Sequence, residues 1–292
     1  MNGVINVDKP AGWTSNDVVC KLKGVLHERR IGHGGTLDPM ATGVLPVFVG
    51  RATRAVEFCE NAQKQYEAGL LLGLVTDTQD VTGTVLSQSP VSVTREELLA
   101  VLPRFTGDLQ QLPPMYSAIK VQGRKLYDLA RKGVEVARKP RAVTVYDLAL
   151  TGGQGPAYTL RVRCSKGTYV RTLCHDIGQA LGCGGALSSL RRTQAGAFRV
   201  EDAYPLQQVI DMAGAGRFDF LLPTDSLFAD LPACTADGAQ EKRCRNGNDY
   251  PCALPDGTWR VYGESGEFLM LGRTEAGRMY TIKSFFEVSK PL

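Results

Sequence analysis

A glycine-rich loop near the N-terminus carries the residue best suited to chemistry, Asp38. It stands near the end of Gly32-His33-Gly34-Gly35-Thr36-Leu37-Asp38-Pro39, where three glycines in four residues permit dihedrals and close approaches that a Cβ would block. Pro39 biases Asp38 away from the helical region and helps to present its carboxylate at a loop edge. Because an isolated Asp-Pro also starts ordinary turns, turn chemistry alone explains this motif, and a plain loop is its simplest interpretation when it is taken by itself.

A polar turn between a predicted strand and a predicted helix holds a second candidate, Arg171. The turn runs from Ser165 to Thr168, and Tyr169 and Arg171 are expected in the first helical turn. An arginine fork can hold a carboxylate ionised and oriented through two parallel hydrogen bonds. The competing interpretation is an ordinary surface arginine with Thr168 as the helix cap.

The stretch 116–141 combines cations with aromatic side chains. Its eight basic residues are Lys120, Arg124, Lys125, Arg131, Lys132, Arg138, Lys139 and Arg141, against two acidic residues, Asp128 and Glu135. Tyr116 and Tyr127 are interleaved with them. This mixture suits phosphate neutralisation and base stacking, although a solvated basic loop and helix would have the same composition.

Other patterns restrict the chemistry. No Walker loop, GxGxxG, HExxH or GxSxG pattern occurs, and the three histidines, His27, His33 and His175, give little support to a histidine triad or metal cage. Of these, His33 lies in the glycine loop beside Asp38. Tyr66, early in a predicted strand, is by itself most simply a packing residue. The residues alone therefore indicate a carboxylate-centred enzyme, or a binder, acting on a phosphate-rich substrate.

Composition is that of a globular protein with one large and one small domain, or two medium ones: 292 residues, 43% hydrophobic and 22% charged. The net charge of +4 is too small to indicate a nucleic-acid partner by itself. The eight cysteines form no C-x-x-C pair, which favours reduced thiols in the cytoplasm. The N-terminus lacks a signal-peptide pattern, and no apolar run reaches the ~18 residues of a membrane span.

Periodicity and capping signals place the elements around these residues. Strands are expected at 4–7, 44–49, 66–74, 143–150 and 157–164, and helices after Thr14-Ser15, after the capping box Thr94–Glu97 and over about 168–181. Pro46 predicts an edge or bulge in its strand. The irregular order of strands and helices favours an α+β fold, and glycine-punctuated runs at 259–262, 268–271 and 280–282 predict a small β-rich C-terminal domain.

Five motifs, taken together and in order, resemble the bacterial TruB tRNA pseudouridine synthases. They are Lys9–Ser15, Gly32–Pro46, Pro114–Lys120, Ser165–Arg171 and Leu190–Arg192. The resemblance covers most of residues 1–225 and continues more weakly at Arg245–Asn248. It implies the α+β pseudouridine synthase fold with a mixed, mostly antiparallel central sheet. It also implies a catalytic domain over 1–228 with an RNA-binding, thumb-like insertion at about 111–141, and a PUA-like domain over 229–292.

The resemblance also implies the activity and its residues. The substrate is the uridine at position 55 in the tRNA T loop, and the enzyme is expected to be a cytoplasmic monomer that needs no cofactor, metal, membrane or protein partner. Asp38 corresponds to the essential aspartate, Tyr66 to the tyrosine that stacks on the target base and is implicated in proton removal, and Arg171 to the arginine paired with the aspartate. The expected substrate-binding residues are His33, which inserts into the T loop, Tyr169 and Leu190, which line the pocket, and Lys9, Tyr116, Lys120 and Arg124. Gly34 differs from the threonine that many relatives carry.

Such roles fit the reaction, which cleaves the N1–C1′ glycosidic bond, turns the uracil and joins C5 to C1′ without redox change. A preorganised carboxylate can stabilise or trap positive character at C1′. Attack of Asp38 on C1′, attack on the base, and removal of a sugar proton to give a glycal are all compatible with the sequence. Two other classes of function also stay open: an RNA-binding or RNA-folding protein without chemistry, and a nucleosidase or other glycosidase.

Overall fold

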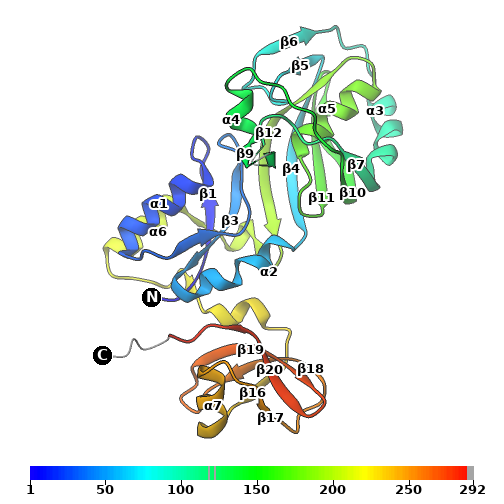
Figure 1. Ribbon diagram of the computed structural model, residues 1–292. Coiled ribbons are helices and arrows are strands. Elements are labelled where there is room, and N and C mark those ends of the chain that lie inside the picture. Colours follow the sequence, from blue (N-terminus) through cyan, green and yellow to red (C-terminus); the bar gives the residue numbers. More distant parts are fainter. Residues whose placement is uncertain (118, 122, 288–292) are drawn as a thin grey trace. The chain divides into compact units, whose positions relative to one another are not determined.

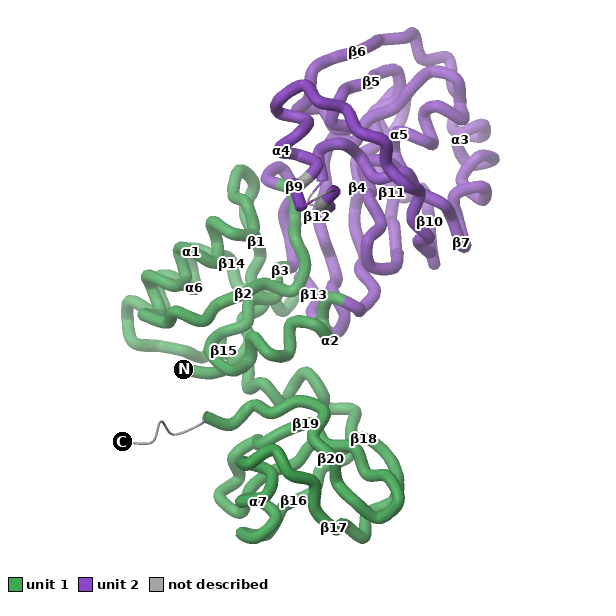
Figure 2. Tube along the Cα trace, viewed as in Figure 1, with its two compact units in different colours: residues 1–38, 45–60, 201–292 green, residues 39–44, 61–200 purple. Residues whose placement is uncertain are grey.

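The computed structural model describes residues 1–117, 119–121 and 123–287. The chain divides into two compact units (Figure 2), one of residues 1–38, 45–60 and 201–292 and the other of residues 39–44 and 61–200. It passes from the first unit to the second directly after Asp38. Within the described residues, every helix is too short or too polar to cross a membrane.

The N-terminal part of the first unit packs helices α1 and α6 against its strands of the 11-stranded sheet (Figure 1). Its elements are β1 (Gly3–Lys9), α1 (Ser15–Leu26), β2 (Ile31–His33), β3 (Thr42–Val49, which begins in the second unit), the 3-10 helix η1 (Gly50–Ala55), α2 (Val56–Glu60), β14 (Tyr204–Pro205), α6 (Leu206–Gly214), β15 (Leu221–Leu222) and the 3-10 helix η4 (Thr224–Phe228). β1 runs parallel to β14 and antiparallel to β15. Val7, Leu22 and Leu206 belong to one buried cluster that joins the helices to the sheet.

Helix α1 begins where the capping signal predicts. The Thr14 side chain accepts from the backbone N–H of Asp17 at 3.0 Å, and the Asp17 carboxylate accepts from the Thr14 N–H at 2.9 Å. Two N–H groups that the helix cannot pair internally are thereby satisfied. The same reciprocal pattern starts α3 at Thr94 and Glu97. Both predicted helix starts are confirmed.

The second unit is built on a mixed, mostly antiparallel sheet, as expected. Its elements are β4 (Lys64–Leu72), β5 (Leu74–Thr76), β6 (Val85–Gln88), α3 (Arg95–Val101), the 3-10 helix η2 (Leu102–Phe105), β7 (Gly107–Gln111), β8 (Lys120–Val121), β9 (Arg124–Lys125), α4 (Leu126–Ala130), β10 (Arg141–Gln154), β11 (Ala157–Cys164), α5 (Val170–Ala180), β12 (Gly185–Ala195), β13 (Phe198–Arg199) and the 3-10 helix η3 (Val200–Asp202), which continues into the first unit. Strands β12, β4, β11, β10 and β7 are antiparallel neighbours in that order, and the start of β3 pairs parallel with β12.

Two local expectations about these elements need correction. Strand β3 is not an edge strand, because it lies between β1 and β12 in the sheet order. It pairs with β12 at Thr42 and Gly43 and with β2 at residues 47–49, and Pro46 lies between these two pairings. Its missing N–H therefore falls where the ladder is already interrupted. Tyr169 is the N-cap of α5 and not a first-turn residue, and it makes no side-chain capping hydrogen bond.

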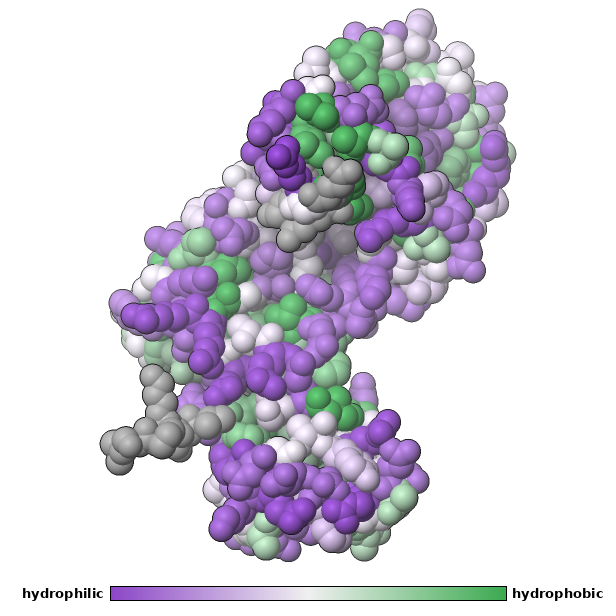
Figure 3. All heavy atoms as spheres, in the orientation of Figure 1, coloured by the Kyte–Doolittle hydropathy of each residue, from purple (hydrophilic) through white to green (hydrophobic). Residues whose placement is uncertain are grey.

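The C-terminal part of the first unit is the predicted β-rich region (Figure 1). It contains β16 (Ala233–Thr235), α7 (Gly238–Arg245), β17 (Tyr250–Pro251), β18 (Gly257–Tyr262), β19 (Phe268–Glu275) and β20 (Arg278–Ser284). The sheet order is β16-β18-β19-β20-β17, so β16 and β17 form its two edges. Buried Tyr250, Val261 and Met279 belong to its core, while its visible surface is largely hydrophilic (Figure 3).

Candidate active site

The glycine loop, residues 32–39, is anchored inside the first unit before it reaches Asp38. The buried Ser15 hydroxyl, at the first residue of α1, accepts from Leu37 N at 2.9 Å and donates to Leu37 O at 3.3 Å. Gly34 N donates to Pro46 O at 2.9 Å. Asp38 is half-buried and follows Leu37, a residue whose backbone is bonded on both sides. A loop fixed in this way presents its carboxylate with little freedom.

Two glycines of this loop are needed for different reasons. Gly35 has a φ of +106°, a conformation that side chains with a Cβ rarely adopt. Gly34 is needed for space, because a Cβ there would lie 2.7 Å from the Sγ of Cys59 and 3.0 Å from the ring of Phe48. The buried Cys59 thiol also donates to Gly34 O at 3.9 Å. Cys59 and Phe48 thus pack closely against the loop at Gly34.

Residues of the first motif and His33 flank the loop. Lys9 ends β1 fully buried, and its Nζ donates to Trp13 O at 2.6 Å and to Pro10 O at 2.9 Å. These bonds hold the turn that leads into α1. His33 ends β2, where it pairs with Val47 of β3 and is half-buried. The substrate-binding roles of Lys9 and His33 stay predictions.

Arg171 is held rigidly within the second unit. It lies in the first turn of α5 with 5% of its surface exposed. Its Nη1 donates to Thr78 O at 2.9 Å and its Nη2 to Tyr116 O at 2.8 Å. Nη1 also lies 3.6 Å from the Oδ2 of Asp80, in an ion pair whose two side chains are each 6% exposed. The alternative of an ordinary surface arginine is therefore wrong.

The sequence interpretation missed Asp80, which organises the loop between β5 and β6. Its Oδ1 accepts from Thr78 Oγ1 at 2.8 Å, from Thr82 N at 2.9 Å and from Thr82 Oγ1 at 2.5 Å. One carboxylate oxygen therefore holds its own loop, and the other faces Arg171. The available signal was the run of two aspartates and three threonines over residues 77–84, which interrupts an apolar strand pattern.

Tyr66 and Leu190 lie on neighbouring strands of the same sheet. Tyr66 of β4 is opposite Val162 of β11 and Arg192 of β12 in the register, and Leu190 of β12 is opposite Ala68. Tyr66 is 9% and Leu190 8% exposed, so each leaves only a small part of its surface accessible. This placement fits a packing role as well as a pocket wall, and their contact with substrate stays a prediction.

The remaining predicted residues surround Arg171 in sequence or in space. Tyr169 immediately precedes α5, and the Gln111 side chain accepts from its N–H at 2.7 Å and donates to its carbonyl at 3.0 Å. The Tyr116 hydroxyl donates to Asp77 at 3.4 Å, and burial together with this carboxylate raises the pKa of Tyr116. The structure thus brings Tyr116 and Arg171 together.

The basic stretch is mostly exposed, as either interpretation requires. Its exposed cations are Arg124, Arg131, Lys132, Lys139 and Arg141. The Arg131 guanidinium lies over the Tyr127 ring, 5.5 Å from its centroid. The backbone of Lys120 belongs to β8, but its side chain lies outside the described part of the chain. Binding of RNA by this stretch stays a prediction.

The chemical groups therefore fall into two sets. The first unit supplies the half-buried Asp38 at the end of an anchored loop, and the second supplies a buried guanidinium and an aromatic side chain on the central sheet. An oriented carboxylate and a fixed cation suit a reaction in which charge develops at a sugar carbon. The direct pairing of Asp38 with Arg171 stays a prediction.

Comparison with known proteins identifies the family. Residues 23–170 match the model of the TruB family pseudouridylate synthase N-terminal domain, and residues 171–229 match the tRNA pseudouridylate synthase B C-terminal domain. The tRNA pseudouridine synthase B of Dechloromonas aromatica is 44% identical over 99% of this chain and 97% of its own. That of Ralstonia pickettii is 46% identical over 90% of this chain and 85% of its own.

A solved structure gives the same result for the fold. The chain of an H/ACA RNP bound to a substrate RNA containing 2′-deoxyuridine superposes with a TM-score of 0.70 and 26% identity. The match covers 98% of this chain and 85% of that chain. The resemblance inferred from the five motifs is thereby confirmed along nearly the whole length. The chain belongs to the TruB family of pseudouridylate synthases.

Proposed function

We propose that this protein isomerises the uridine at position 55 of the tRNA T loop to pseudouridine, with Asp38 as the essential carboxylate. The observation that carries the proposal is the family match, which spans the anchored loop of Asp38 and continues through Arg171. The solved relative bound to a substrate RNA supports RNA as the ligand of this fold. The same proposal assigns the catalytic domain to 1–228, with an RNA-binding insertion at 111–141, and a PUA-like domain to 229–292, in a cytoplasmic monomer.

Each proposed role follows from the chemistry of the side chain. The Asp38 carboxylate faces C1′ as the N1–C1′ bond breaks, and Arg171, fixed by Thr78, Tyr116 and Asp80, keeps that carboxylate ionised and oriented. Tyr66 stacks on the detached uracil while the base turns to present C5. Because a base inside the T loop is hidden, the nucleotide first flips out, at a cost of a few kcal/mol that stacking and phosphate contacts offset.

The decisive experiment is site-resolved pseudouridine mapping on unmodified tRNA and on an isolated T-arm stem-loop. Conversion at position 55 alone is the expected result, with no release of free uracil. RNA binding without any product would instead identify an RNA-binding or RNA-folding protein. Free base together with an abasic site, detected by mass spectrometry, would identify a glycosidase.

Arg124→Gln is expected to weaken tRNA binding and to flatten its salt dependence by up to about one unit of slope per lost phosphate contact. Arg124 is exposed in β9, inside the basic stretch. The measurement is the dissociation constant over a series of salt concentrations. Arg95→Gln, a change at an exposed arginine at the start of α3, is the matched control and should leave the slope unchanged. An unaltered slope for Arg124→Gln would remove this residue from the RNA footprint.

Gly34→Ala is expected to lower kcat by roughly tenfold to a hundredfold, because a Cβ 2.7 Å from the Cys59 sulfur and 3.0 Å from the Phe48 ring leaves rotation of Cys59 as the only relief short of displacing the loop that ends at Asp38. Single-turnover kinetics on the stem-loop, with the RNA dissociation constant measured in parallel, will separate kcat from binding. Adding Cys59→Ala removes the closest clashing atom and should restore part of the rate. Gly24→Ala, which meets nothing within 4 Å, is the control. Unchanged kcat in Gly34→Ala would show that the loop tolerates displacement.

A further inference from the structure

The five-stranded C-terminal sheet has an open seam between its two edge strands. β16 and β17 stand at opposite ends of the strand order, yet residues of both line one cavity of about 750 Å³. Cys234 and Thr235 come from β16, and Tyr250 to Leu254 come from β17 and the segment after it. The sheet is therefore curled until its edges face each other across this cavity, without joining.

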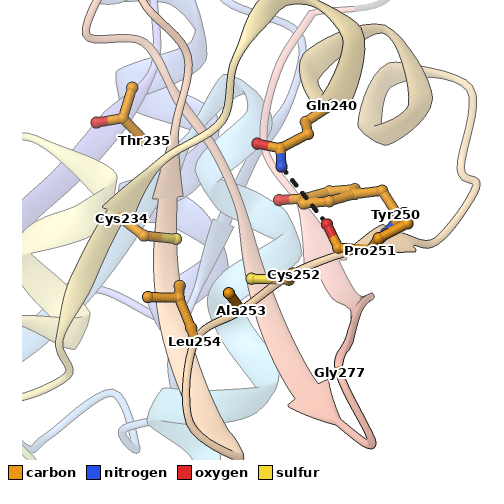
Figure 4. A pocket seen from close by; sticks show the side chains of 9 residues that line it. All are labelled: Cys234, Thr235, Gln240, Tyr250, Pro251, Cys252, Ala253, Leu254 and Gly277. Carbon is orange, nitrogen blue, oxygen red and sulfur yellow. Dashed lines mark hydrogen bonds between the residues drawn. The ribbon is translucent and has the colours of Figure 1, made fainter.

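Two thiols meet at the seam. The side chains of Cys234 and Cys252 point toward each other from the two sides of the cavity (Figure 4). Both backbones are fixed: Cys234 pairs with Val261 of β18, and Cys252 N donates to Gly277 O at 2.9 Å. Neither sulfur has a hydrogen-bond partner among the residues that the structure describes. Each sulfur is thus free to reorient by rotation about a single side-chain bond.

The pKa of Cys234 reflects the same proximity of the two sulfurs. Burial, and then the neighbouring Cys252, raise the pKa of Cys234 to about 11. One thiolate opposes ionisation of another only over a short distance. Burial and the nearby cysteines also raise the pKa of Tyr250, whose ring lines the same cavity. The Cys234 thiol and the Tyr250 hydroxyl are consequently neutral near pH 7.

We propose that Cys234 and Cys252 form a redox-active dithiol that closes the seam of the C-terminal sheet as a disulfide. The oxidant is a low-molecular-weight disulfide. One cysteine loses its proton to solvent and, as the thiolate, attacks that disulfide, forms a mixed disulfide and releases one small thiolate. The second cysteine loses its proton to solvent and attacks the protein sulfur of the mixed disulfide, releasing the other small thiolate. The two cysteines lose two electrons in total, and the small disulfide is reduced to two thiols.

The Cys234–Cys252 disulfide would constrain the segment between β16 and β17, which carries α7. This segment leaves the sheet after β16 and returns at β17, so Cys234 and Cys252 stand at its two ends. Across this part of the fold, the Gln240 amide donates to Pro251 O at 3.5 Å, a long and weak hydrogen bond. A covalent bond between the ends removes conformational freedom from the unfolded chain and stabilises the closed region. Oxidation therefore stiffens a part of the molecule that the reduced form leaves open.

The test uses the full chain under native conditions with oxidised glutathione, followed by alkylation and non-reducing peptide mapping. The expected product is a Cys234–Cys252 cross-linked peptide pair, two hydrogen atoms lighter than the reduced pair. It should disappear on reduction. The exposed Cys20 on α1 should stop at a mixed disulfide with glutathione. The oxidised chain should also unfold at a temperature several degrees higher than the reduced chain.

Single variants supply the controls. Cys234→Ser and Cys252→Ser should each leave the remaining partner as a mixed disulfide and cancel the rise in unfolding temperature. Alanine at either position gives the same comparison if serine alters folding, which circular dichroism checks. Two separate glutathione adducts on Cys234 and Cys252 in one native molecule would overturn the proposal. Formation of the cross-link only after denaturation would overturn it as well.

Discussion

Asp38→Asn is expected to abolish pseudouridine formation while tRNA affinity stays within about tenfold, or roughly 1.4 kcal/mol. If, as proposed, the Asp38 carboxylate faces the sugar, it contributes mainly in the transition state, so its loss affects kcat far more than binding. The side chain is half-buried at the end of a loop that Ser15 and Pro46 hold from outside, so the amide should leave the loop in place. Single-turnover mapping and a binding titration measure the two effects separately.

The control is Asp256→Asn, an exposed carboxylate in the C-terminal region that is expected to leave both quantities unchanged. Since asparagine can deamidate to aspartate, the variant must be checked by mass spectrometry before and after the assay. Turnover that persists in a deamidation-free preparation would remove Asp38 from the proposed chemistry. A large loss of affinity with unaltered kcat would move its role to substrate binding.

Asp80→Asn is expected to lower the free energy of unfolding by about 3 kcal/mol and to reduce kcat strongly. The Arg171–Asp80 pair is buried on both sides, and replacing the Asp80 carboxylate by a neutral amide removes a negative charge that lies 3.6 Å from a buried guanidinium. The amide oxygen can still accept from Thr78 and Thr82, so the loop itself should persist. Urea denaturation measures the stability, and single-turnover kinetics in the absence of denaturant measures kcat.

The exposed pair of Arg161 and Asp147 provides the matched control. Their contact distance is 3.0 Å, but their side chains are 46% and 38% exposed. Solvent screens such a pair, so Asp147→Asn should change the free energy of unfolding by less than about 1 kcal/mol. Equal effects of the two substitutions would mean that burial does not set the strength of the Arg171–Asp80 pair. Normal kcat in Asp80→Asn would exclude this carboxylate from positioning Arg171.

Local sequence determined several of the elements and the family, but the central strand β12 and helix α6 were not predicted from it. The capping boxes at Thr14 and Thr94 place helix starts correctly because a side chain three positions away satisfies the backbone. Alternation in 157–164 gives β11, and the glycine-punctuated runs give the C-terminal strands. The five motifs, which include those around Asp38 and Arg171, together indicated the family, because each is a short contiguous pattern.

Tertiary structure decided which distant residues complete these motifs. Gly34 is compatible with many loops, and only the fold shows that Cys59, 25 positions later, occupies the space a Cβ would need. The sequence alone is compatible with an exposed helical Arg171. In the structure the loop of Thr78, 93 positions earlier, covers this side chain and places Asp80 beside it. The two cysteines at the sheet edges are unremarkable in sequence, and the curl of the sheet makes them neighbours. Spacing along the chain encodes hydrogen bonds within a turn, whereas packing between remote segments depends on the whole set of contacts that the chain buries.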